Sequence, residues 1–243
     1  MSRRVVFKIN KKLDFKNHLI GISRIPSVNN MPAEHKEYYK KLKSALDVEN
    51  QRKIFEKETS RFYGKDSKKF RVLMVKQVQE MWDLMEKPYF EKMDKIHKNK
   101  FPLRKVNGIL STTPMVYGYN FDGLNPWFTC SYNSPIKAVH TTMHEMMHVY
   151  FHKYFFKKYK KKFKLTNNQI WTVKESLTVL LNLEFGGLRI FPDRGKLGHE
   201  KLRNRIKKDW VKYGDLDKVM EKICLCVKKV NFKGYFATWA KSV

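Results

Sequence analysis

The feature that most limits how this chain can fold is a stretch, Ile136–Leu165, that contains neither glycine nor proline. Its apolar residues recur three or four positions apart, at Val139, Met143, Met146 or Met147, and Tyr150. Ser134 and Pro135 come directly before the stretch. Serine is a favoured N-cap residue, and proline is well tolerated in the first turn of a helix. The pattern therefore predicts a helix that carries these apolar residues, with Pro135 in its first turn.

This predicted helix carries His144-Glu145-Met146-Met147-His148, which fits the H-E-x-x-H pattern of zinc hydrolases. Residues four apart lie on the same helix face, so His144 and His148 can bind one Zn²⁺ at about 2.0–2.1 Å per nitrogen. The Glu145 carboxylate can take a proton from a metal-activated water and pass it to a leaving amine. The motif predicts one Zn²⁺ per chain and Glu145 as the catalytic base.

A catalytic zinc ion needs a third protein ligand, and the predicted helix does not supply it. His140 and His152 continue the four-residue spacing, but eight helical residues rise about 12 Å, too far for either to complete the pair. The metzincin pattern requires a glycine and a third histidine where this chain has Phe151 and Tyr154, which excludes that class. The third ligand is therefore expected from another segment.

Glu175 is the leading candidate for the third ligand. It lies 27 residues after His148, on a second predicted helix that begins at Thr166 or Asn167 and ends at Gly186-Gly187. This helix is apolar on most of its circumference, which predicts burial. A buried carboxylate needs a metal ion or a basic partner, so a salt-bridged structural glutamate remains the alternative.

Together the two segments, Val139–Leu183, resemble the gluzincin metallopeptidases, in which a second helix supplies a glutamate ligand after H-E-x-x-H. The run Trp171–Thr178 is similar to the W-x-x-E-G-x-A block of the aminopeptidase-like members, with one extra residue between the tryptophan and the glutamate. The resemblance implies a zinc-dependent peptidase with a zincin-like catalytic domain. It also implies three zinc ligands and one general base: His144, His148 and Glu175, with Glu145 as the base.

The chain departs from these aminopeptidases in two ways: the gap between His148 and Glu175 is longer, and no G-A-M-E-N-like block is present. Exopeptidase specificity is therefore not implied. His199 is a rival third ligand or a transition-state donor, since H-E-x-x-H proteases of nucleic-acid-bound proteins use three histidines. A basic binding protein with a non-catalytic zincin fold is the alternative from another class. Glu145 argues against it, because a structural metal site needs no base.

The formal net charge of +28 invites a nucleic-acid partner, but only 11 of the 51 basic residues are arginine, the side chain best suited to bidentate phosphate contacts. Nucleic acid is therefore a possible partner that is not favoured. The run Lys153–Lys164 interleaves basic and aromatic residues. It predicts either a solvated helix face or a surface for an acidic peptide or protein substrate.

The composition, 42% hydrophobic, supports a folded core, and the predicted fold class is α+β. We expect a mainly helical region over residues 1–100 and a zincin-like catalytic domain over 101–243. Met1–Asn10 has no signal-peptide run, and no stretch reaches about 18 apolar residues, so a cytoplasmic protein without a membrane span is expected. The three cysteines form no C-x-x-C pair and are expected to be reduced.

Shorter patterns predict the remaining elements. In the first region, the β-like runs are Val5–Phe7 and Leu19–Ile22, and the expected helices cover residues 33–47, 48–63 and 68–98. Three strands are expected before the H-E-x-x-H helix, at Val106–Leu110, Met115–Tyr119 and Trp127–Tyr132. The gluzincin resemblance implies that one edge strand binds substrate, and Trp127–Ser131 is the candidate, with an ordinary packing strand as the alternative. The last expected helices are His199–Tyr213, Asp215–Val230 and Gly234–Trp239.

Overall fold

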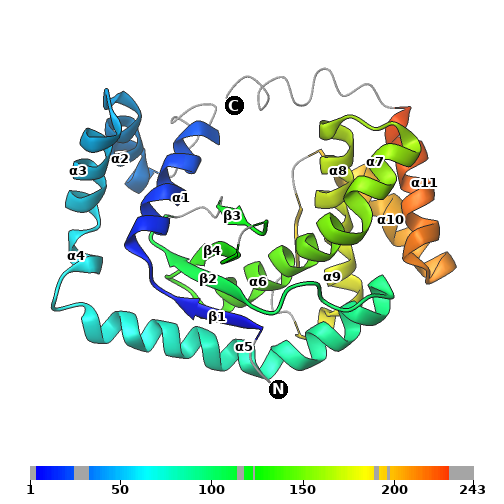
Figure 1. Cartoon of the computed structure of the whole chain (residues 1–243), viewed down its shortest axis with the longest axis horizontal. Helices are drawn as coiled ribbons and strands as arrows, with labels where there is room; N and C mark the ends of the chain where they lie inside the picture. The colour runs from blue at the N-terminus through cyan, green and yellow to red at the C-terminus, as the bar shows by residue number, and fades with distance from the viewer. Residues whose placement is uncertain are drawn as a thin grey trace. The chain divides into compact units, whose positions relative to one another are not determined.

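The structure is a computed structural model that describes residues 4–24, 33–113, 118–122, 124–188, 192–195 and 198–229. These residues form an α+β protein, mostly helical, with a four-stranded mixed sheet (Figure 1). The contacts define two compact units. The first contains the described parts of Met1–Leu84 and Lys105–Val139, and the second contains Met85–Arg104 and the described part of His140–Phe236.

The sheet belongs entirely to the first unit, and its strands are β1 (Val5–Lys8), β2 (Val106–Ser111), β3 (Tyr119–Asn120) and β4 (Trp127–Ser131). Their order is β1-β2-β4-β3, in which β1, β2 and β4 run parallel and β3 is antiparallel to β4. Because β1 pairs with β2, the sheet joins the chain's first residues to the segment after residue 105. Each compact unit therefore combines segments from both sides of residue 100.

Three aligned residues show how tightly the sheet packs. Gly108 of β2 is the register partner of Phe7 on one side and of Phe128 on the other. The two aromatic rings meet edge to face with their centroids 6.4 Å apart. A Cβ at position 108 would lie 2.5 Å from the Phe7 ring, so only glycine fits between them.

The predicted strands at Val5–Phe7, Val106–Leu110 and Trp127–Tyr132 are confirmed. Of the predicted strand Met115–Tyr119, only Tyr119 is in β3, and residues 115–117 lie outside the described ranges. The assignment of Trp127–Ser131 as an edge strand is wrong. These five residues form β4, are buried, and lie between β2 and β3.

The prediction of a β-like run at Leu19–Ile22 is also wrong, because these residues lie inside helix α1 (Lys11–Arg24). The Asn10 side chain accepts a hydrogen bond from the Leu13 backbone NH at 3.0 Å and so caps the helix start. A four-residue apolar run fits either a strand or a buried helix turn. Here the helix is favoured by the Asn10 cap upstream of the run and by the buried polar side chain of Asp14 on the same helix.

That polar face is centred on Asp14, whose side chain is fully buried. Its carboxylate accepts hydrogen bonds from the hydroxyls of Ser111 (2.5 Å), Thr112 (2.7 Å) and Tyr63 (2.7 Å). It also accepts from the Thr112 backbone NH at 3.1 Å. One buried charge on α1 is thus compensated by four donors, three of which come from the end of β2, and this anchors α1 to the sheet.

The other helices of the first unit are α2 (Ala33–Ser44), α3 (Val48–Glu58), α4 (Ser60–Tyr63) and the first part of α5 (Lys68–His97). They cover the predicted helices over residues 33–47, 48–63 and 68–98, although the second is divided at Thr59. Pro88 lies within the continuous span of α5. Among the described residues, Cys130, Cys224 and Cys226 form no disulfide.

The predicted helix after Ser134 is confirmed as α6 (Pro135–Tyr150). It continues directly into a π-helix (Phe151–Phe156) and α7 (Lys157–Phe163). The Ser134 hydroxyl accepts from the Lys137 backbone NH at 3.3 Å, so Ser134 is the predicted N-cap. Four further helices follow, namely α8 (Asn167–Leu177), α9 (Val179–Glu184), α10 (Glu200–Tyr213) and α11 (Leu216–Lys228). The predicted helix Gly234–Trp239 lies outside the described residues.

The basic and aromatic residues after α6 are used largely for packing within the second unit. The side chains of Tyr159 and Phe163 on α7 are buried. Lys158 forms an ion pair with Asp217 of α11 at 2.8 Å, and the neighbouring turn repeats this arrangement between Lys162 and Glu221. The contact between α7 and α11 thus uses two lysines and two aromatic residues of the interleaved run, while Lys153, Lys157, Lys161 and Lys164 are exposed. Among the described residues, no helix combines the length and apolar character needed to cross a bilayer.

Candidate metal centre

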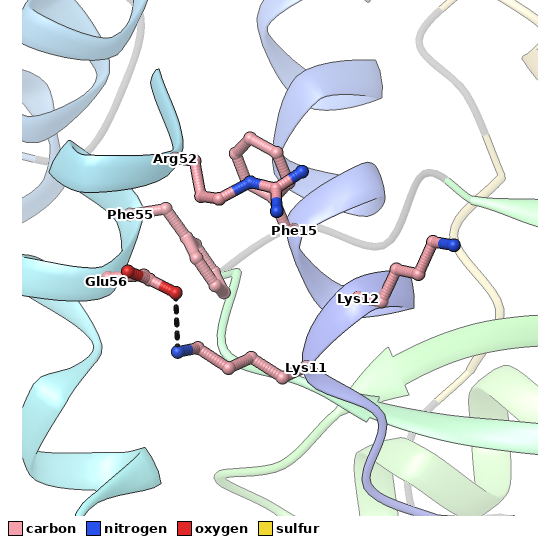
Figure 2. A pocket seen from close by; sticks show the side chains of 6 residues that line it. All are labelled: Lys11, Lys12, Phe15, Arg52, Phe55 and Glu56. Atoms are coloured by element: carbon pink, nitrogen blue, oxygen red, sulfur yellow. Dashed lines mark hydrogen bonds and ion pairs between the residues drawn. The ribbon is translucent and has the colours of Figure 1, made fainter. Parts of the chain in front are cut away.

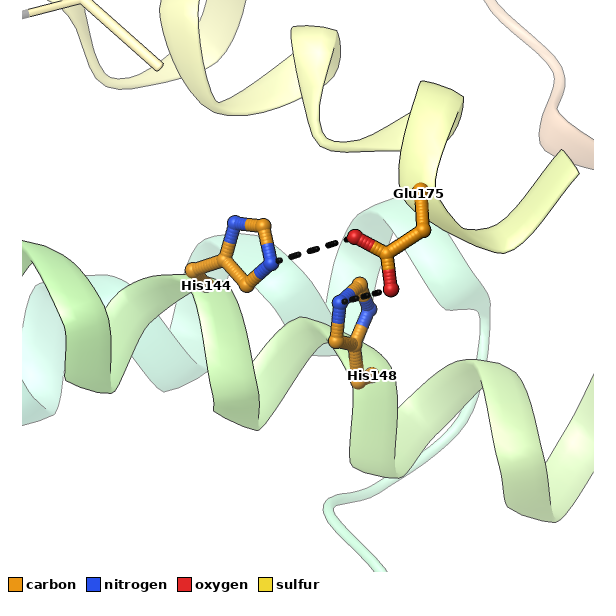
Figure 3. A group of neighbouring side chains, drawn as sticks. All are labelled: His144, His148 and Glu175. Carbon is orange, nitrogen blue, oxygen red and sulfur yellow. Dashed lines mark ion pairs between the residues drawn. The ribbon is translucent and has the colours of Figure 1, made fainter. Parts of the chain in front are cut away.

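Two helices of the second unit bring three predicted ligands together (Figure 3). His144 and His148 lie one turn apart on α6, with ring centroids 4.4 Å apart. Glu175 of α8 directs one carboxylate oxygen at each ring: Oε2 lies 3.8 Å from His144 Nε2, and Oε1 lies 3.5 Å from His148 Nε2. One ligand atom from each residue lies within 4.8 Å of the others. Among the described residues, this group meets the geometric requirement for a shared metal ion.

Both helices are fixed close to these residues. Tyr89 on α5 is buried and donates its hydroxyl to the Met143 carbonyl oxygen of α6 at 2.6 Å, immediately before His144. The start of α8 has a reciprocal capping box, in which Thr166 and Gln169 each bond the other's backbone NH. Glu175 therefore lies two turns inside a well-started helix, and its side chain is 7% exposed.

Asp193 is a further member of the site that sequence reasoning missed. Its Oδ2 lies 2.8 Å from His144 Nδ1, on the side of the ring away from Glu175. Metal-binding histidines usually donate their second ring NH to a carboxylate or a carbonyl, which fixes the tautomer and the orientation of the ring. Asp193 accepts this proton on Nδ1, which leaves Nε2 directed towards the shared metal position.

The loop that carries Asp193 is itself well held. The Asp193 backbone exchanges two hydrogen bonds with the Asn182 side chain, at 2.6 and 2.8 Å. Its Oδ1 lies 3.2 Å from the Arg203 guanidinium and accepts from the Gly195 backbone NH at 3.0 Å. Gly195 has φ +66°, and a Cβ there would lie 2.6 Å from Arg203, so glycine is required for this turn.

Thr178 connects the Asp193 loop to the glutamate helix. The predicted single helix over residues 166–186 is divided at this residue into α8 and α9. The Thr178 hydroxyl lies 2.8 Å from both Asp193 Oδ1 and the Glu175 carbonyl oxygen, and it accepts a hydrogen bond from Arg203 at 2.8 Å. The helix break thus places a hydroxyl between the carboxylate that orients His144 and the backbone of the third ligand.

The surroundings shift the pKa values of His144 and His148 in opposite directions. Burial opposes the charged form of His144, but the hydrogen bond and charge of Asp193, together with Glu145 and Glu175, raise its pKa. Burial lowers the pKa of His148 well below its usual value, and the Lys174 charge lowers this pKa further. Burial also acts to raise the pKa of Asp193, yet the His144 interaction holds it well below its ordinary value. His148 is therefore a neutral imidazole, the form that binds metals.

The site also contains a group that a simple metal site lacks, namely the buried side chain of Lys174. It is 2% exposed, and its Nζ lies 2.9 Å from Glu175 Oε1, the oxygen that faces His148. The sequence analysis allowed either a metal ion or a basic partner for Glu175. The structure places a basic partner on one oxygen of the carboxylate, while both oxygens face histidine nitrogens.

The other predicted site residues lie in different settings. Glu145 is partly exposed on α6, close enough to His144 for its charge to raise the pKa of that histidine. His152 stacks on Phe156, with ring centroids 5.1 Å apart, and is outside the three-residue group. His199 is buried at the N-cap of α10, with its ring centroid 6.3 Å from that of Trp171. His140 and His199 are likewise outside the group.

The residues of this group fit a divalent metal ion. Two imidazoles and a carboxylate are typical zinc donors. Neither ring nitrogen of His148 has a hydrogen-bond partner among the described residues, although both nitrogens are buried. His148 Nε2 faces Glu175 Oε1 at 3.5 Å, close enough for one cation to bind both atoms. A cation bound by both atoms would satisfy them, and the Asp193 contact already fixes the other ring.

A separate cavity of about 390 Å³ lies in the first unit between α1 and α3 (Figure 2). Phe15 and Phe55 form its buried base, while exposed basic side chains, including Arg52, border it. Lys11 and Glu56 form an ion pair at 2.7 Å within this cavity (Figure 2). None of its lining residues belongs to the His144, His148 and Glu175 group.

Comparisons with known proteins gave no match. No protein-family model, curated protein or solved structure matches this chain. The functional conclusion therefore rests on the site residues and their geometry.

Proposed function

We propose that this chain is a zinc-dependent peptidase, in which His144, His148 and Glu175 bind the metal and Glu145 is the general base. The observation that carries the proposal is the convergence of three ligand atoms within 4.8 Å, although Glu175 is distant from the histidines in sequence. An orienting carboxylate, Asp193, contacts the back of one ligand at 2.8 Å. This combination is typical of metal sites, where such outer contacts set ligand orientation.

A bound Zn²⁺ would lower the pKa of a coordinated water towards about 7 and polarise the carbonyl of the peptide bond. The chain supplies the proton transfers. Glu145 directly follows the ligand His144 on α6, and in the proposed reaction its carboxylate would accept the proton of the attacking water. It then delivers that proton to the amine that leaves, as general acid–base catalysis requires. Asp193 keeps the Nδ1 proton of His144 in place throughout, so Nε2 stays available as a donor.

The number of ligands favours a catalytic site over a structural one. Structural zinc is almost always held by four protein ligands, whereas catalytic zinc keeps an open position. Among the described residues, the group offers three ligands, and Glu145 lies next to one of them. A fold that used the metal only for stability would need a fourth ligand and no base. This argues against the alternative of a binding protein with a non-catalytic zincin fold.

The three-histidine alternative receives less support. It requires His199 to replace Glu175, but His199 packs against Trp171 and lies outside the ligand group. Its link to nucleic-acid-associated proteins also depended on the high positive charge. That charge comes mostly from lysine, since only 11 of the 51 basic residues are arginine. A peptidase with a glutamate ligand is therefore the function that the site supports best.

The experiment combines metal analysis with cleavage of a fluorescence-quenched random peptide library. The wild type loaded with one equivalent of Zn²⁺ should cleave library members. A chelator should abolish cleavage and added Zn²⁺ should restore it. Glu145→Gln should keep the zinc but lose at least about 10²–10⁴-fold in rate, because the amide cannot accept the proton.

The matched control is Glu221→Gln on α11, which removes a carboxylate that pairs with Lys162 outside the metal group. This variant should keep both zinc and activity. Wild-type cleavage rates in Glu145→Gln would contradict the assigned base. Zinc-loaded wild type that cleaves no library member would contradict the peptidase assignment.

A further inference from the structure

Lys174 is the buried charge that the proposed reaction does not use. Lysine is rarely buried without a partner, and this side chain is 2% exposed. Its Nζ lies 2.9 Å from Glu175 Oε1, and the same oxygen lies 3.5 Å from His148 Nε2. One carboxylate oxygen is therefore shared between a protein cation and the proposed metal position.

The contact is built into helix α8 itself. Consecutive helix residues point about 100° apart, so the long Lys174 side chain has to fold back to reach Glu175. Trp171, one turn earlier, lies beneath it, with Nζ 5.7 Å from the ring centroid. An aromatic face attracts an ammonium group and limits where it can go. Trp171, Lys174 and Glu175 thus form one contact group on α8.

Two effects of Lys174 on metal binding oppose each other. As a hydrogen-bond donor, it orients the carboxylate, which favours binding. As a cation, it repels a divalent ion bound to the same oxygen, which weakens binding. Repulsion between charges of +1 and +2 a few ångströms apart in a partly buried site exceeds the gain from one charge-assisted hydrogen bond. The electrostatic effect therefore decides the sign.

We infer that Lys174 is a built-in countercharge for Glu175, which stabilises the metal-free fold and lowers the affinity of the site for Zn²⁺. It acts through Glu175 and is therefore a positioning residue, with no direct part in the reaction. The consequence is a site that exchanges zinc more readily than two histidines and a glutamate would without the lysine. Metal occupancy then responds to the supply of zinc, while the fold does not depend on it. The inference rests on the proposed metal site and not on peptide hydrolysis.

The first test measures zinc affinity by competition with a chromogenic chelator. Lys174→Met removes both the charge and the donor, and Lys174→Gln removes the charge but keeps a donor. Both variants should bind Zn²⁺ at least about tenfold more tightly than the wild type, because the Lys174 charge no longer repels the ion. Lys174→Arg keeps the charge and should stay close to the wild type.

The second test measures thermal unfolding with and without zinc. Without zinc, Lys174→Met should unfold at a lower temperature than the wild type, because Glu175 keeps a buried charge without its lysine. Saturating zinc should raise the midpoint more in this variant, since tighter binding to the native state adds more stability. The control is Lys158→Met, which removes one exposed charge from α7 and should change neither zinc affinity nor the zinc-induced shift.

The outcomes separate this inference from the proposed function. Unchanged or weaker zinc binding in both Lys174→Met and Lys174→Gln would overturn it while leaving the metal site intact. If Lys174→Met does not fold without zinc, Lys174→Gln and the zinc-loaded Lys174→Met still give the affinities that decide the sign. Wild type that binds no zinc would instead refute the metal site and, with it, the role of Lys174.

Discussion

The contact between Asp193 and His144 gives a quantitative prediction. Asp193→Asn keeps the size of the side chain and an oxygen acceptor for His144 Nδ1, but it removes the negative charge that lies 2.8 Å away. Loss of such an orienting partner typically reduces metal affinity by about 10–100-fold. At about 1.4 kcal/mol for each factor of ten, this corresponds to about 1.4–2.8 kcal/mol of zinc binding.

The same substitution also affects the fold, because Asp193 has a second charged partner. Arg203 lies 3.2 Å from Asp193 Oδ1 and is itself 7% exposed. Leaving one member of a buried ion pair without its partner costs about 3–5 kcal/mol, and the remaining amide acceptor places the expected loss at the lower end of this range. Urea unfolding without zinc measures this loss, and chelator competition at low urea measures zinc binding separately.

The matched control for this prediction is Asp209→Asn. Asp209 is also buried and pairs with Arg205 at 2.8 Å, but on α10 and outside the ligand group. We expect Asp209→Asn to lower stability without changing zinc affinity. A folded Asp193→Asn protein that binds zinc within twofold of the wild type would refute the orienting role of Asp193.

Two further predictions concern the fold. Burial lowers the pKa of both His18 and His97 to about 4, so the unfolded chain binds protons first as the pH falls below about 6.5. These two histidines should each lower the stability by about 1.4 kcal/mol per pH unit as the pH falls from about 6.5 to about 4. The variant His97→Gln should therefore show a shallower slope in urea titrations at pH 7, 6 and 5, and a flat wild-type profile over this range would contradict the reasoning. Asp14→Ala should cost at least about 3 kcal/mol in urea unfolding, because it leaves several buried donors unsatisfied, and a loss below about 1 kcal/mol would show that the network is not needed.

The parts of the site that were predictable are those fixed by local geometry. A four-residue spacing on a helix determines how His144 and His148 face each other, whatever surrounds them. The absence of glycine and proline, with the Ser134 cap, identified that helix. Glu175 was selected because a carboxylate on an apolar helix needs a partner, and the structure brings its oxygens to 3.5 and 3.8 Å from the histidine rings.

The contacts that could not be predicted depend on tertiary folding. Asp193 lies in the turn Pro192-Asp193-Arg194-Gly195, whose composition marks a loop but gives no direction for the carboxylate. An acidic residue in a short turn after the glutamate helix was the available signal. The contact of Lys174 with its neighbour Glu175 was hidden for another reason, because consecutive helix residues are expected to diverge. Only the buried setting of α8 makes the lysine turn back.

The first unit shows a similar division between local and distant effects. The short β-like run at Val5–Phe7 identified β1, but its pairing with β2 joins residues about a hundred positions apart and places Lys105–Val139 in the first unit. The error at Leu19–Ile22 arose because a short apolar run does not distinguish a strand from a helix turn. The hydrogen bonds to Asp14, which favour the helix, come from side chains of β2 and α4.

X-ray absorption at the zinc edge, with metal stoichiometry on the same samples, tests the central claim most directly. The account predicts one Zn²⁺ per chain, bound by two imidazole nitrogens and a carboxylate oxygen at about 2.0–2.2 Å. His148→Ala and Glu175→Ala should lose most of the metal, whereas His199→Ala should keep it with an unchanged spectrum. A spectrum with three imidazoles, together with zinc lost from His199→Ala and kept in Glu175→Ala, would contradict the proposed ligand set.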